Sequence, residues 1–398
     1  MSDASAQNVP AQIALDTRLV HAGRVGGTGP VNTPVHRAST ILFDTVADLD
    51  AAKAARFAKG TLFYGRFGTP DTFAFEEAVS ALEAGAATVA VPSGLAACVL
   101  PLVAFLRPGD HVLVADTIYE PTRTSLNAFI ARNGVAVEYV DPRADLAPLL
   151  RPETRMIYLE SPGSLTFELQ DLPAVAALAK GRGIVTVCDN TWATGYFCQP
   201  LALGIDIVVQ AATKYIVGHS DAMLGTVTVA DAALHKPLRE AANWLGHAVA
   251  PDAIYLGARG LRSLGARLKQ HHATGLDLAR WLETQPGIAR VLHPGLASHP
   301  DHAIFRRDFR GASGLFSVLL DTTDRAIATR FADSLALFGL GFSWGGFESL
   351  VLPGDPAHAR TATAWTEDRQ LVRLHAGLED PADLRADLAQ ALARCLPA

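Results

Sequence analysis

The chain has 398 residues, of which 49% are hydrophobic, and a formal net charge of -6. This length is enough for two or three domains with substantial cores, and the acidic balance with scattered Lys and Arg argues against a nucleic-acid partner. No apolar stretch approaches the roughly 18 residues of a membrane span, and the polar N-terminus lacks a secretory signal pattern, so we expect a cytoplasmic protein.

The cysteines and histidines predict neither a disulfide framework nor a metal site. The four cysteines form no CxxC pair, and a chain of this length does not depend on disulfides for its core. His299 and His302 in SHPDH have a spacing suited to metal ligands, but no second pair accompanies them. We therefore expect no metal.

The first part of the chain, up to about Phe57, is predicted to be irregular because Gly and Pro interrupt it, as in RVGGTGPVNTP. Such a segment cannot form its own core and must lie on another surface. Helical patterns then alternate with short apolar runs, in the order ATVAVPS, HVLVAD, AVEYVD, TRMIYLES, IVTVCDN and IDIVVQAATK. Continuous β-branched runs between helices predict a mostly parallel sheet buried on both faces.

The pattern of predicted elements changes after about Tyr255. A long amphipathic helical pattern is followed by two strand candidates, GLFSVLLD and QLVRLHAG, and by a final helix, PADLRADLAQALARCL. The fold class predicted is therefore α/β, with a central domain followed by a smaller α+β domain. We place the boundaries at residues 1–65, 66–258 and 259–398.

Polar or Gly-bearing turns follow the predicted strands, at the sheet edge where open parallel sheets bind their ligands. In PSGLAA, Gly94 allows close backbone approach at the start of a helix, whose free N–H groups suit a phosphate. A tight strand-to-helix turn explains this motif equally well.

Two further strand ends carry Asp189 (CDNTWATG) and Lys214 (AATKYIVG). Asp189 is either an Asx turn or helix cap, or a buried carboxylate that keeps a ring nitrogen protonated. Lys214 is either a solvated strand-end charge or an amine whose pKa is lowered by burial, which makes it a nucleophile toward an aldehyde cofactor. Thr213, just before it, carries a hydroxyl that suits a phosphate.

Three other side chains are equally ambiguous when taken singly. Tyr119 in DTIYEP is either a packing aromatic or one that stacks on a cofactor ring. Arg66 in YGRFGTP is either a solvated turn residue or a bidentate phosphate ligand. Arg373 interrupts an apolar strand and needs an anionic partner, which is either a substrate carboxylate or a structural acidic side chain.

Together, a phosphate turn, a stacking aromatic, a strand-end Asp and a strand-end Lys in one α/β domain describe a pyridoxal 5'-phosphate (PLP) site. The chain resembles the Cys/Met-metabolism PLP enzymes of fold type I, and within them the bacterial cystathionine β-lyases. The resemblance runs from about Asp16 to Asp380 and rests on the motifs VNTPVHRAST, YGRFGTP, PSGLAA, LESPGSLTFELQD, CDNTWATG, AATKYIVGHSDAMLG, RGLRSLGARL, FSWGGFESL and VRLHAGLED.

The resemblance implies an aspartate-aminotransferase-like fold and roles for the residues of the central domain. Lys214 would bind the cofactor covalently and later move the Cα proton, and Asp189 would pair with the ring nitrogen. Tyr119 would stack on the ring and is also counted among the catalytic residues. The phosphate would be held by Gly94, Leu95 and Thr213.

The resemblance also implies an active site shared between subunits of a homotetramer built as a dimer of dimers. Tyr64 and Arg66 would reach the phosphate in the neighbouring subunit, with Tyr64 also counted among the catalytic residues. Arg373 and Ser343 would bind the α-carboxylate of an amino-acid substrate, and Trp344 would line the substrate pocket. The irregular N-terminal segment would lie across the neighbour.

The expected reaction is the β-elimination of L-cystathionine to L-homocysteine, pyruvate and ammonia in methionine biosynthesis, with activity on cystine or cysteine as well. Relatives that act at Cγ commonly carry ESLGG where this chain has Phe342, Ser343 and Trp344 in FSWGG, and ESPTNP where it has ESPGSL. The alternatives left open are a γ-synthase, γ-lyase or sulfhydrylase, a broader cysteine-conjugate β-lyase, and an inactive binding protein on the same fold.

Two positions depart from the family pattern. Ala211 stands where many members have Ser, which removes one phosphate contact, and Phe347 stands where many β-lyases have Tyr. His219 and Asp221, which follow Lys214 in the same motif, fit the pattern but have no chemical role that the sequence assigns.

Overall fold

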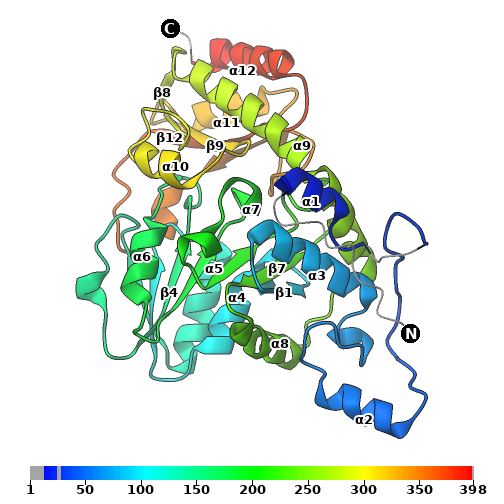
Figure 1. Ribbon diagram of the computed structural model, residues 1–398. Coiled ribbons are helices and arrows are strands. Elements are labelled where there is room, and N and C mark those ends of the chain that lie inside the picture. Colours follow the sequence, from blue (N-terminus) through cyan, green and yellow to red (C-terminus); the bar gives the residue numbers. More distant parts are fainter. Residues whose placement is uncertain (1–12, 25–27, 397–398) are drawn as a thin grey trace.

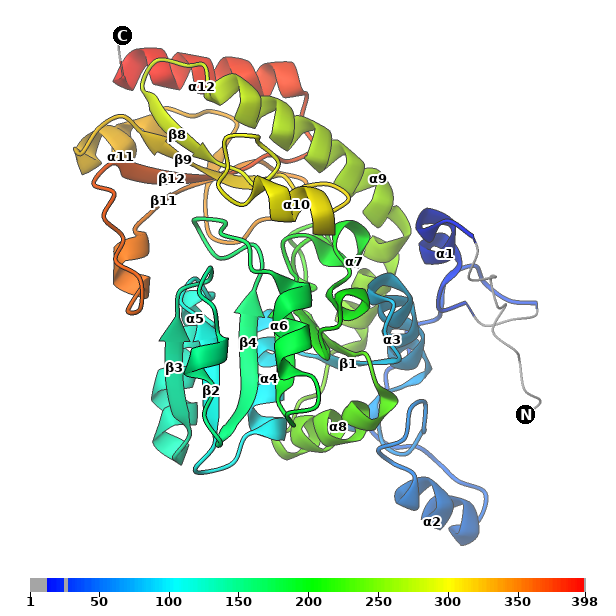
Figure 2. The ribbon, with the colours of Figure 1, turned by 60° about the vertical axis from the view of Figure 1, so that its left-hand side comes forward.

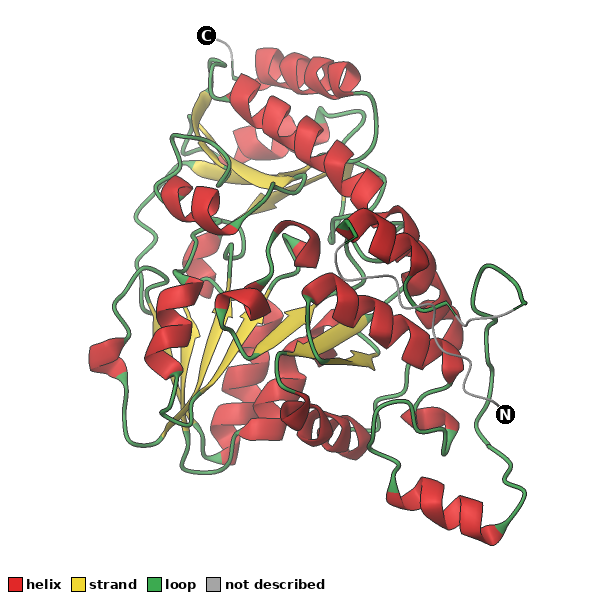
Figure 3. Ribbon diagram, in the orientation of Figure 1, coloured by secondary structure: helices red, strands yellow, loops and turns green. Residues whose placement is uncertain are grey.

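The computed structural model describes residues 13–24 and 28–396, which form a large and a small β-sheet with helices packed around both (Figures 1 and 3). The large sheet has seven strands in the order β1-β7-β6-β5-β4-β2-β3. Its strands are β1 (Ala87–Val91), β2 (His111–Ala115), β3 (Ala136–Val140), β4 (Thr154–Glu160), β5 (Val185–Asp189), β6 (Ile207–Gln210) and β7 (Gly225–Val229).

The large sheet is mostly parallel, which confirms the predicted fold class. Strands β3, β2, β4, β5 and β6 pair in parallel, while β7 runs antiparallel to both β6 and β1. Six of these strands match the apolar runs recognised in the sequence; β7 was not predicted. Because parallel strands end at the same edge, the turns after β1, β2, β4, β5 and β6 come together there.

Both faces of the large sheet are buried, as continuous apolar strands require. In β4, Ile157 and Leu159 face one core while Met156 and Tyr158 face the other. Helices α3 (Pro70–Glu83), α6 (Leu172–Ala179) and α7 (Thr194–Phe197) contribute to the first core, and α4 (Gly94–Phe105) and α8 (His235–Trp244) to the second. The short helix α5 (Glu120–Ser125) follows β2.

The small sheet has the order β10-β11-β12-β9-β8 and a core of its own, closed by α9, α11 and α12. Figure 2 shows α9 running from the large domain along the small sheet. Its elements are α9 (Pro251–Leu282), β8 (Ile288–Leu292), α10 (His302–Asp308), β9 (Leu315–Leu320), α11 (Arg325–Asp333), β10 (Gly339–Leu340), β11 (Leu350–Gly354), β12 (Gln370–His375) and α12 (Pro381–Cys395).

The long helical pattern after Tyr255 is one continuous helix of 32 residues, α9. The boundary proposed between residues 258 and 259 falls inside this helix, which therefore packs against both α3 of the central domain and α12 of the small one. The division into three units remains a proposal.

The prediction that the chain is irregular up to about Phe57 was wrong in part, because two short helices lie there: α1 (Leu15–His21) and α2 (Val46–Ala54). Thr45 caps α2 by accepting a hydrogen bond from the N–H of Asp48 at 3.1 Å, and Asp48 lies in the first turn, where an acid is favoured. No side chain of α2 is buried, and the helix stands away from the rest of the chain (Figures 1 and 2).

Within residues 13–24 and 28–396, no helix combines the length and the apolar character needed to cross a membrane. The same residues contain no group of three or more His, Cys, Asp or Glu side chains arranged to hold a metal ion.

Candidate active site

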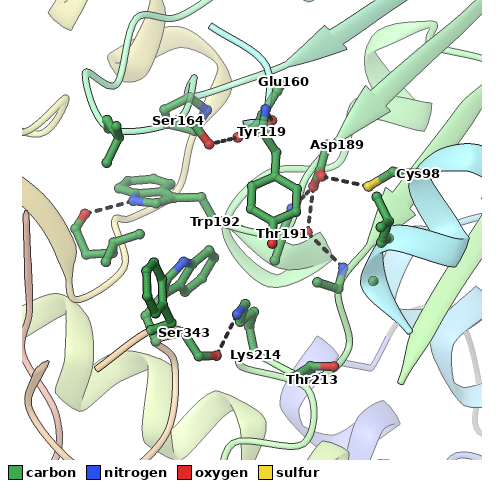
Figure 4. A pocket seen from close by; sticks show the side chains of 18 of the residues that line it. Cys98, Tyr119, Glu160, Ser164, Asp189, Thr191, Trp192, Thr213, Lys214 and Ser343 are labelled. Carbon is green, nitrogen blue, oxygen red and sulfur yellow. Dashed lines mark hydrogen bonds between the residues drawn. The ribbon is translucent and has the colours of Figure 1, made fainter. Parts of the chain in front are cut away.

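A cavity of about 400 Å³ lies at the carboxyl ends of the parallel strands, between the large sheet and the small domain (Figure 4). It brings together nine of the eleven residues to which the sequence analysis gave a role in the site. Those nine are Gly94, Leu95, Tyr119, Asp189, Thr213, Lys214, Ser343, Trp344 and Arg373.

Lys214 lies in the turn after β6, with its amine inside this cavity. Its Nζ donates a hydrogen bond to Ser343 Oγ at 2.5 Å and lies 5.4 Å from the centre of the Trp344 ring. Burial, followed by the nearby charge of Arg373, lowers the pKa of the Lys214 amine to about 8, while Asp189 opposes this shift. An amine with this pKa is a much better nucleophile and base near neutral pH than a solvated lysine.

Asp189 ends β5 and points into the same space (Figure 4). Its Oδ1 accepts hydrogen bonds from the backbone N–H of Thr191 at 2.9 Å and from the Thr191 hydroxyl at 2.5 Å, and its Oδ2 lies 3.4 Å from Cys98 Sγ. Burial raises the pKa of the Asp189 carboxyl, and the Thr191 hydrogen bonds oppose that shift. A buried carboxylate held this way is suited to pair with a cation in the cavity.

Glu160 is a residue of the cavity that the sequence reasoning missed. It ends β4 directly beside Asp189, accepts a hydrogen bond from the backbone N–H of Tyr119 at 2.6 Å, and accepts another from the Ser164 hydroxyl at 2.8 Å. Burial, and then the charge of Asp189, raise the pKa of Glu160 well above its usual value. The signal was present in LESPGS, since Glu160 ends an apolar strand just as Asp189 does.

The first turn of α4 forms the end of the cavity that suits an anion. Ser93 caps the helix by accepting from the N–H of Ala96 at 3.1 Å, and the first N–H groups of any helix have no partner within it. A Cβ on Gly94 would lie only 2.5 Å from the Cβ of Ala211, so glycine is needed for this close approach of helix and strand end.

Thr213 lines the same end of the cavity, but its hydroxyl donates to the carbonyl oxygen of Leu224 at 3.1 Å and accepts from the Leu224 N–H at 2.9 Å. To donate to a phosphate, the Thr213 hydroxyl would have to give up its hydrogen bond to the Leu224 carbonyl oxygen.

The small domain forms the opposite wall of the cavity. Arg373 on β12 donates from Nη2 to the carbonyl oxygen of Ser343 at 3.1 Å, and burial lowers the pKa of this arginine to about 10. Ser343 has a φ of 83°, in the left-handed region that non-glycine residues rarely occupy. Phe342 lies at the mouth, with 87% of its surface exposed.

Tyr64 and Arg66 do not line this cavity. They lie beside a separate hollow of about 530 Å³ next to α2, where Arg66 hydrogen-bonds to the side chain of Asn243 and Tyr64 is 41% exposed. Within one chain, therefore, the structure brings nine of the predicted residues together and leaves these two apart.

His219 and Asp221, in the turn after Lys214, have no chemical role in this structure. His219 makes a 2.8 Å hydrogen bond from Nδ1 to the carbonyl oxygen of Val217, and neither side chain lines the cavity. At the two departures from the family pattern, Ala211 donates its N–H to Thr191 Oγ1 at 2.8 Å, and Phe347 is largely exposed.

Residues 16–393 match the family model described as Cys/Met metabolism PLP-dependent enzyme. The cystathionine β-lyase of Escherichia coli is 43% identical over 390 residues, covering 96% of this chain and 98% of that protein. The cystathionine β-lyase of Bordetella avium is 42% identical over 401 residues, covering 99% and 100%. A cystathionine γ-synthase of Mycobacterium bovis is 38% identical over 384 residues, covering 94% and 96%.

Among solved structures, metB from Corynebacterium glutamicum superposes with a TM-score of 0.88 at 31% identity, covering 96% of this chain and 98% of that one. The family match spans nearly the whole length of the chain and includes both walls of the cavity. The chain therefore belongs to the Cys/Met metabolism PLP-dependent enzyme family.

Proposed function

We propose that this protein is a PLP-dependent carbon–sulfur lyase that cleaves L-cystathionine to L-homocysteine, pyruvate and ammonia, as a step of methionine biosynthesis. The observation that carries the proposal is the position of the Lys214 amine, between the Asp189 wall and the Ser343–Arg373 wall of one buried cavity. The two β-lyases named above, each more than 40% identical over nearly the whole chain, support the choice of reaction.

The residues of the cavity fit PLP. The anion-binding end of α4 suits the phosphate, and the glycine that permits it has no room for a side chain. Lys214 supplies a partly deprotonated amine for the aldehyde, and Asp189 a buried carboxylate for the protonated ring nitrogen. We propose that Gly94, Leu95 and Thr213 hold the phosphate and that Tyr119 stacks on the ring.

Bound PLP supplies an aldehyde that condenses with amines and a ring that accepts the electron pair released at Cα. The protein does the rest. Arg373 and Ser343 bind the substrate carboxylate and orient the Cα–H bond. The Lys214 amine would take the Cα proton at Nζ, which its lowered pKa favours near neutral pH.

Elimination then breaks the Cβ–S bond, and homocysteine leaves as the thiolate, which takes a proton to become the thiol. The three-carbon fragment is released as 2-aminoacrylate, and water converts it to pyruvate and ammonia. Asp189 would hold the protonated ring nitrogen through its carboxylate and would transfer no proton itself.

The wall made by Phe342 and Trp344 supports cleavage at Cβ rather than Cγ. Both side chains are large and apolar where γ-acting relatives commonly have Glu and Leu, and both line the cavity. These bulky apolar side chains would narrow the cavity where the distal part of the substrate lies.

The keto acid formed from L-cystathionine tests this proposal. The purified holoenzyme should form pyruvate and homocysteine in equal amounts, with cystine or cysteine as further substrates to compare. Formation of 2-oxobutyrate would instead identify a γ-lyase, and synthesis of cystathionine from cysteine and an O-acylhomoserine would identify a γ-synthase. A protein that binds PLP but turns over none of these would be a binding protein.

We also propose a homotetramer built as a dimer of dimers, in which Tyr64 and Arg66 complete the cavity of the neighbouring subunit. The members of this family are typically oligomeric. Around the hollow beside α2 the chain exposes large apolar side chains, including Leu42 at 89%. A second copy of the chain that covers these side chains would bury this surface and place Tyr64 at the cavity of that second copy.

Mixing two inactive variants tests the shared site. Tyr64→Ala and Lys214→Ala homotetramers, unfolded together and refolded, should recover about one quarter of the native sites, because a hybrid dimer then has one site with both native residues. The same protocol with each variant alone is the control. Recovery no greater than in these controls would place Tyr64 outside the neighbour's site.

A cytoplasmic location also remains our proposal. It is supported by Cys98, Cys188, Cys198 and Cys395, which are all free thiols in the interior, as is usual for a protein kept in a reducing compartment.

A further inference from the structure

The turn formed by residues 342–346, here called the Ser343 turn, has an unfavourable backbone. Ser343 and Gly345 both have a φ of 83°, and only the second is a glycine. A Cβ on Gly345 would lie 3.0 Å from the backbone of Lys214 and Tyr215, so the turn is packed directly against the chain that carries Lys214. Such a conformation persists only where surrounding contacts hold it.

Two of the contacts on Ser343 come from the residues that the proposed reaction uses. Lys214 Nζ donates to the Ser343 hydroxyl, and Arg373 Nη2 donates to the Ser343 carbonyl oxygen. When the cofactor and a substrate occupy the cavity, Lys214 Nζ would have another partner, and Arg373 would share its five N–H groups with the substrate carboxylate. These two contacts therefore depend on what the cavity holds.

A third contact does not depend on any ligand. His375, two residues after Arg373 on β12, is 1% exposed, and its Nε2 accepts a hydrogen bond from the N–H of Gly345 at 3.0 Å. The carbonyl oxygen of Gly346 lies farther from the same nitrogen, at 3.4 Å. The shorter contact makes Nε2 the acceptor and places the imidazole proton on Nδ1.

The surroundings of His375 keep this ring fixed and neutral. It lies 5.2 Å from the ring of His271 and 5.9 Å from that of Tyr215, and Tyr215 in turn packs 5.5 Å from Trp344. Burial lowers the pKa of His375 well below its usual value; His271, Arg373 and Lys214 add to this, and the contact with the Gly346 carbonyl oxygen opposes it. A neutral imidazole retains the lone pair that the Gly345 N–H requires.

We propose that His375 is a positioning residue: by holding Gly345, it keeps the Ser343 turn in the shape that binds the substrate carboxylate. This inference rests on the proposed function, which places the carboxylate between Ser343 and Arg373. The residue itself touches neither substrate nor cofactor, and acts only through the turn.

Two amines that differ only in a carboxylate test the proposal. 2-Methylalanine has the amine and the carboxylate but no Cα proton, and isopropylamine has the amine alone. Each is titrated into the holoenzyme and followed by the change in the visible absorption of the cofactor. His375→Leu removes the acceptor, and His375→Gln replaces it with an amide oxygen at a similar reach.

His375→Leu should weaken binding of 2-methylalanine about tenfold, the usual effect of leaving a buried N–H without its acceptor, and leave isopropylamine unchanged. His375→Gln should restore most of that loss. With a productive substrate, KM should rise far more than kcat falls. The matched control is His293→Leu, which removes another buried imidazole that accepts from a glycine N–H, at 2.9 Å, and does not line the cavity.

Equal weakening of both amines, or weakening of neither, would overturn the proposal. So would an effect of His293→Leu of the same size, because loss of stability would then account for it. The titration is independent of the leaving group. If cystathionine gave no pyruvate while 2-methylalanine still required His375, the proposed reaction would fail and the role of His375 would stand.

Discussion

The two walls of the active-site cavity are built in different ways. On the large-sheet side, Asp189 and Glu160 end neighbouring strands, and Lys214 lies in the turn that follows the next strand of the same sheet. On the small-domain side, Ser343 and Arg373 lie 30 residues apart in the chain and meet through a strained turn. The first wall is positioned by a continuous hydrogen-bonded ladder. In the second wall only Arg373 lies on a paired strand, while the Ser343 turn is held by a few side-chain contacts.

This difference teaches which groups can tolerate change. A sheet buried on both faces fixes its strand ends with little freedom, so we expect the large-sheet wall to keep its geometry when one polar contact is lost. The Ser343 turn has fewer contacts to lose. Substitutions in the wall proposed to hold the cofactor should therefore lower kcat. Substitutions in the wall proposed to hold the substrate should instead weaken substrate binding and raise KM.

The largest effect is expected for Lys214→Ala. Removing the amine takes away both the covalent attachment and the proposed base, and loss of a general base alone costs about 10²–10⁴-fold in rate. Pyruvate formation and the visible absorption of the covalently attached cofactor measure it. Lys269→Ala, at an exposed lysine paired with Asp16, is the matched control and should be silent. Turnover of Lys214→Ala within tenfold of the parent would mean that the base lies elsewhere.

Asp189→Asn should follow, with a loss of about 100-fold in kcat, since removal of one preorganised electrostatic contact typically has that size. The amide keeps the shape of the side chain but not the charge that holds the ring nitrogen protonated. Asp221→Asn, on an exposed side chain after Lys214, serves as the control. A fall confined to KM would contradict the assignment of Asp189 to the cofactor wall.

Arg373→Leu should act on the other wall and raise KM about tenfold or more, because a hydrogen bond to a charged group contributes about 1.5–3 kcal/mol. The change in kcat should be smaller. Arg369→Leu, at the nearby arginine that pairs with Asp321 on the surface, is the control. If kcat fell as much as kcat/KM, Arg373 would belong to the chemistry of the first wall instead.

The smallest effect is expected in the pH dependence of PLP binding, because Arg373 of the second wall influences the pKa of Lys214 in the first. Only the neutral amine of Lys214 reacts with an aldehyde, and burial and Arg373 lower its pKa to about 8. The rate at which apoprotein combines with PLP should therefore rise with pH, by about tenfold per unit, and level off near pH 8.

In Arg373→Leu the cation that helps to lower this pKa is gone, so the same plateau should move to higher pH. The reaction is followed by the change in cofactor absorption after mixing. A plateau near the pKa of a solvated lysine in the parent protein would show that the Lys214 amine is not desolvated.

Much of the large-sheet wall could be predicted from the sequence. Asp189 and Lys214 each follow an apolar strand, and the rule that parallel strands end at one edge brings them together without knowledge of the fold in detail. Glu160 meets the same criterion and was overlooked because its motif, LESPGS, was recognised only as a turn. Strand β7 was missed as well, although GTVTV is a β-branched run.

The small-domain wall was less predictable. Arg373 stood out as a charge in an apolar strand, but its partner Ser343 was identified only through the family resemblance. Nothing local in FSWGG indicates a left-handed Ser343 or the hydrogen bond from Gly345 to His375. These features arise where β12 and the turn pack against the chain after Lys214. The helix α2, which buries no side chain, was likewise read as irregular chain.

The sequence by itself determined the parallel sheet, the order of the polar strand ends and the chemical types placed there, because strand periodicity and turn residues are local properties. The tertiary structure decided the lowered pKa of Lys214, the neutral state of His375 and the strained Ser343 turn. Each of these depends on burial and on charges brought close from distant parts of the chain, and desolvation exists only once the two domains have closed around the cavity.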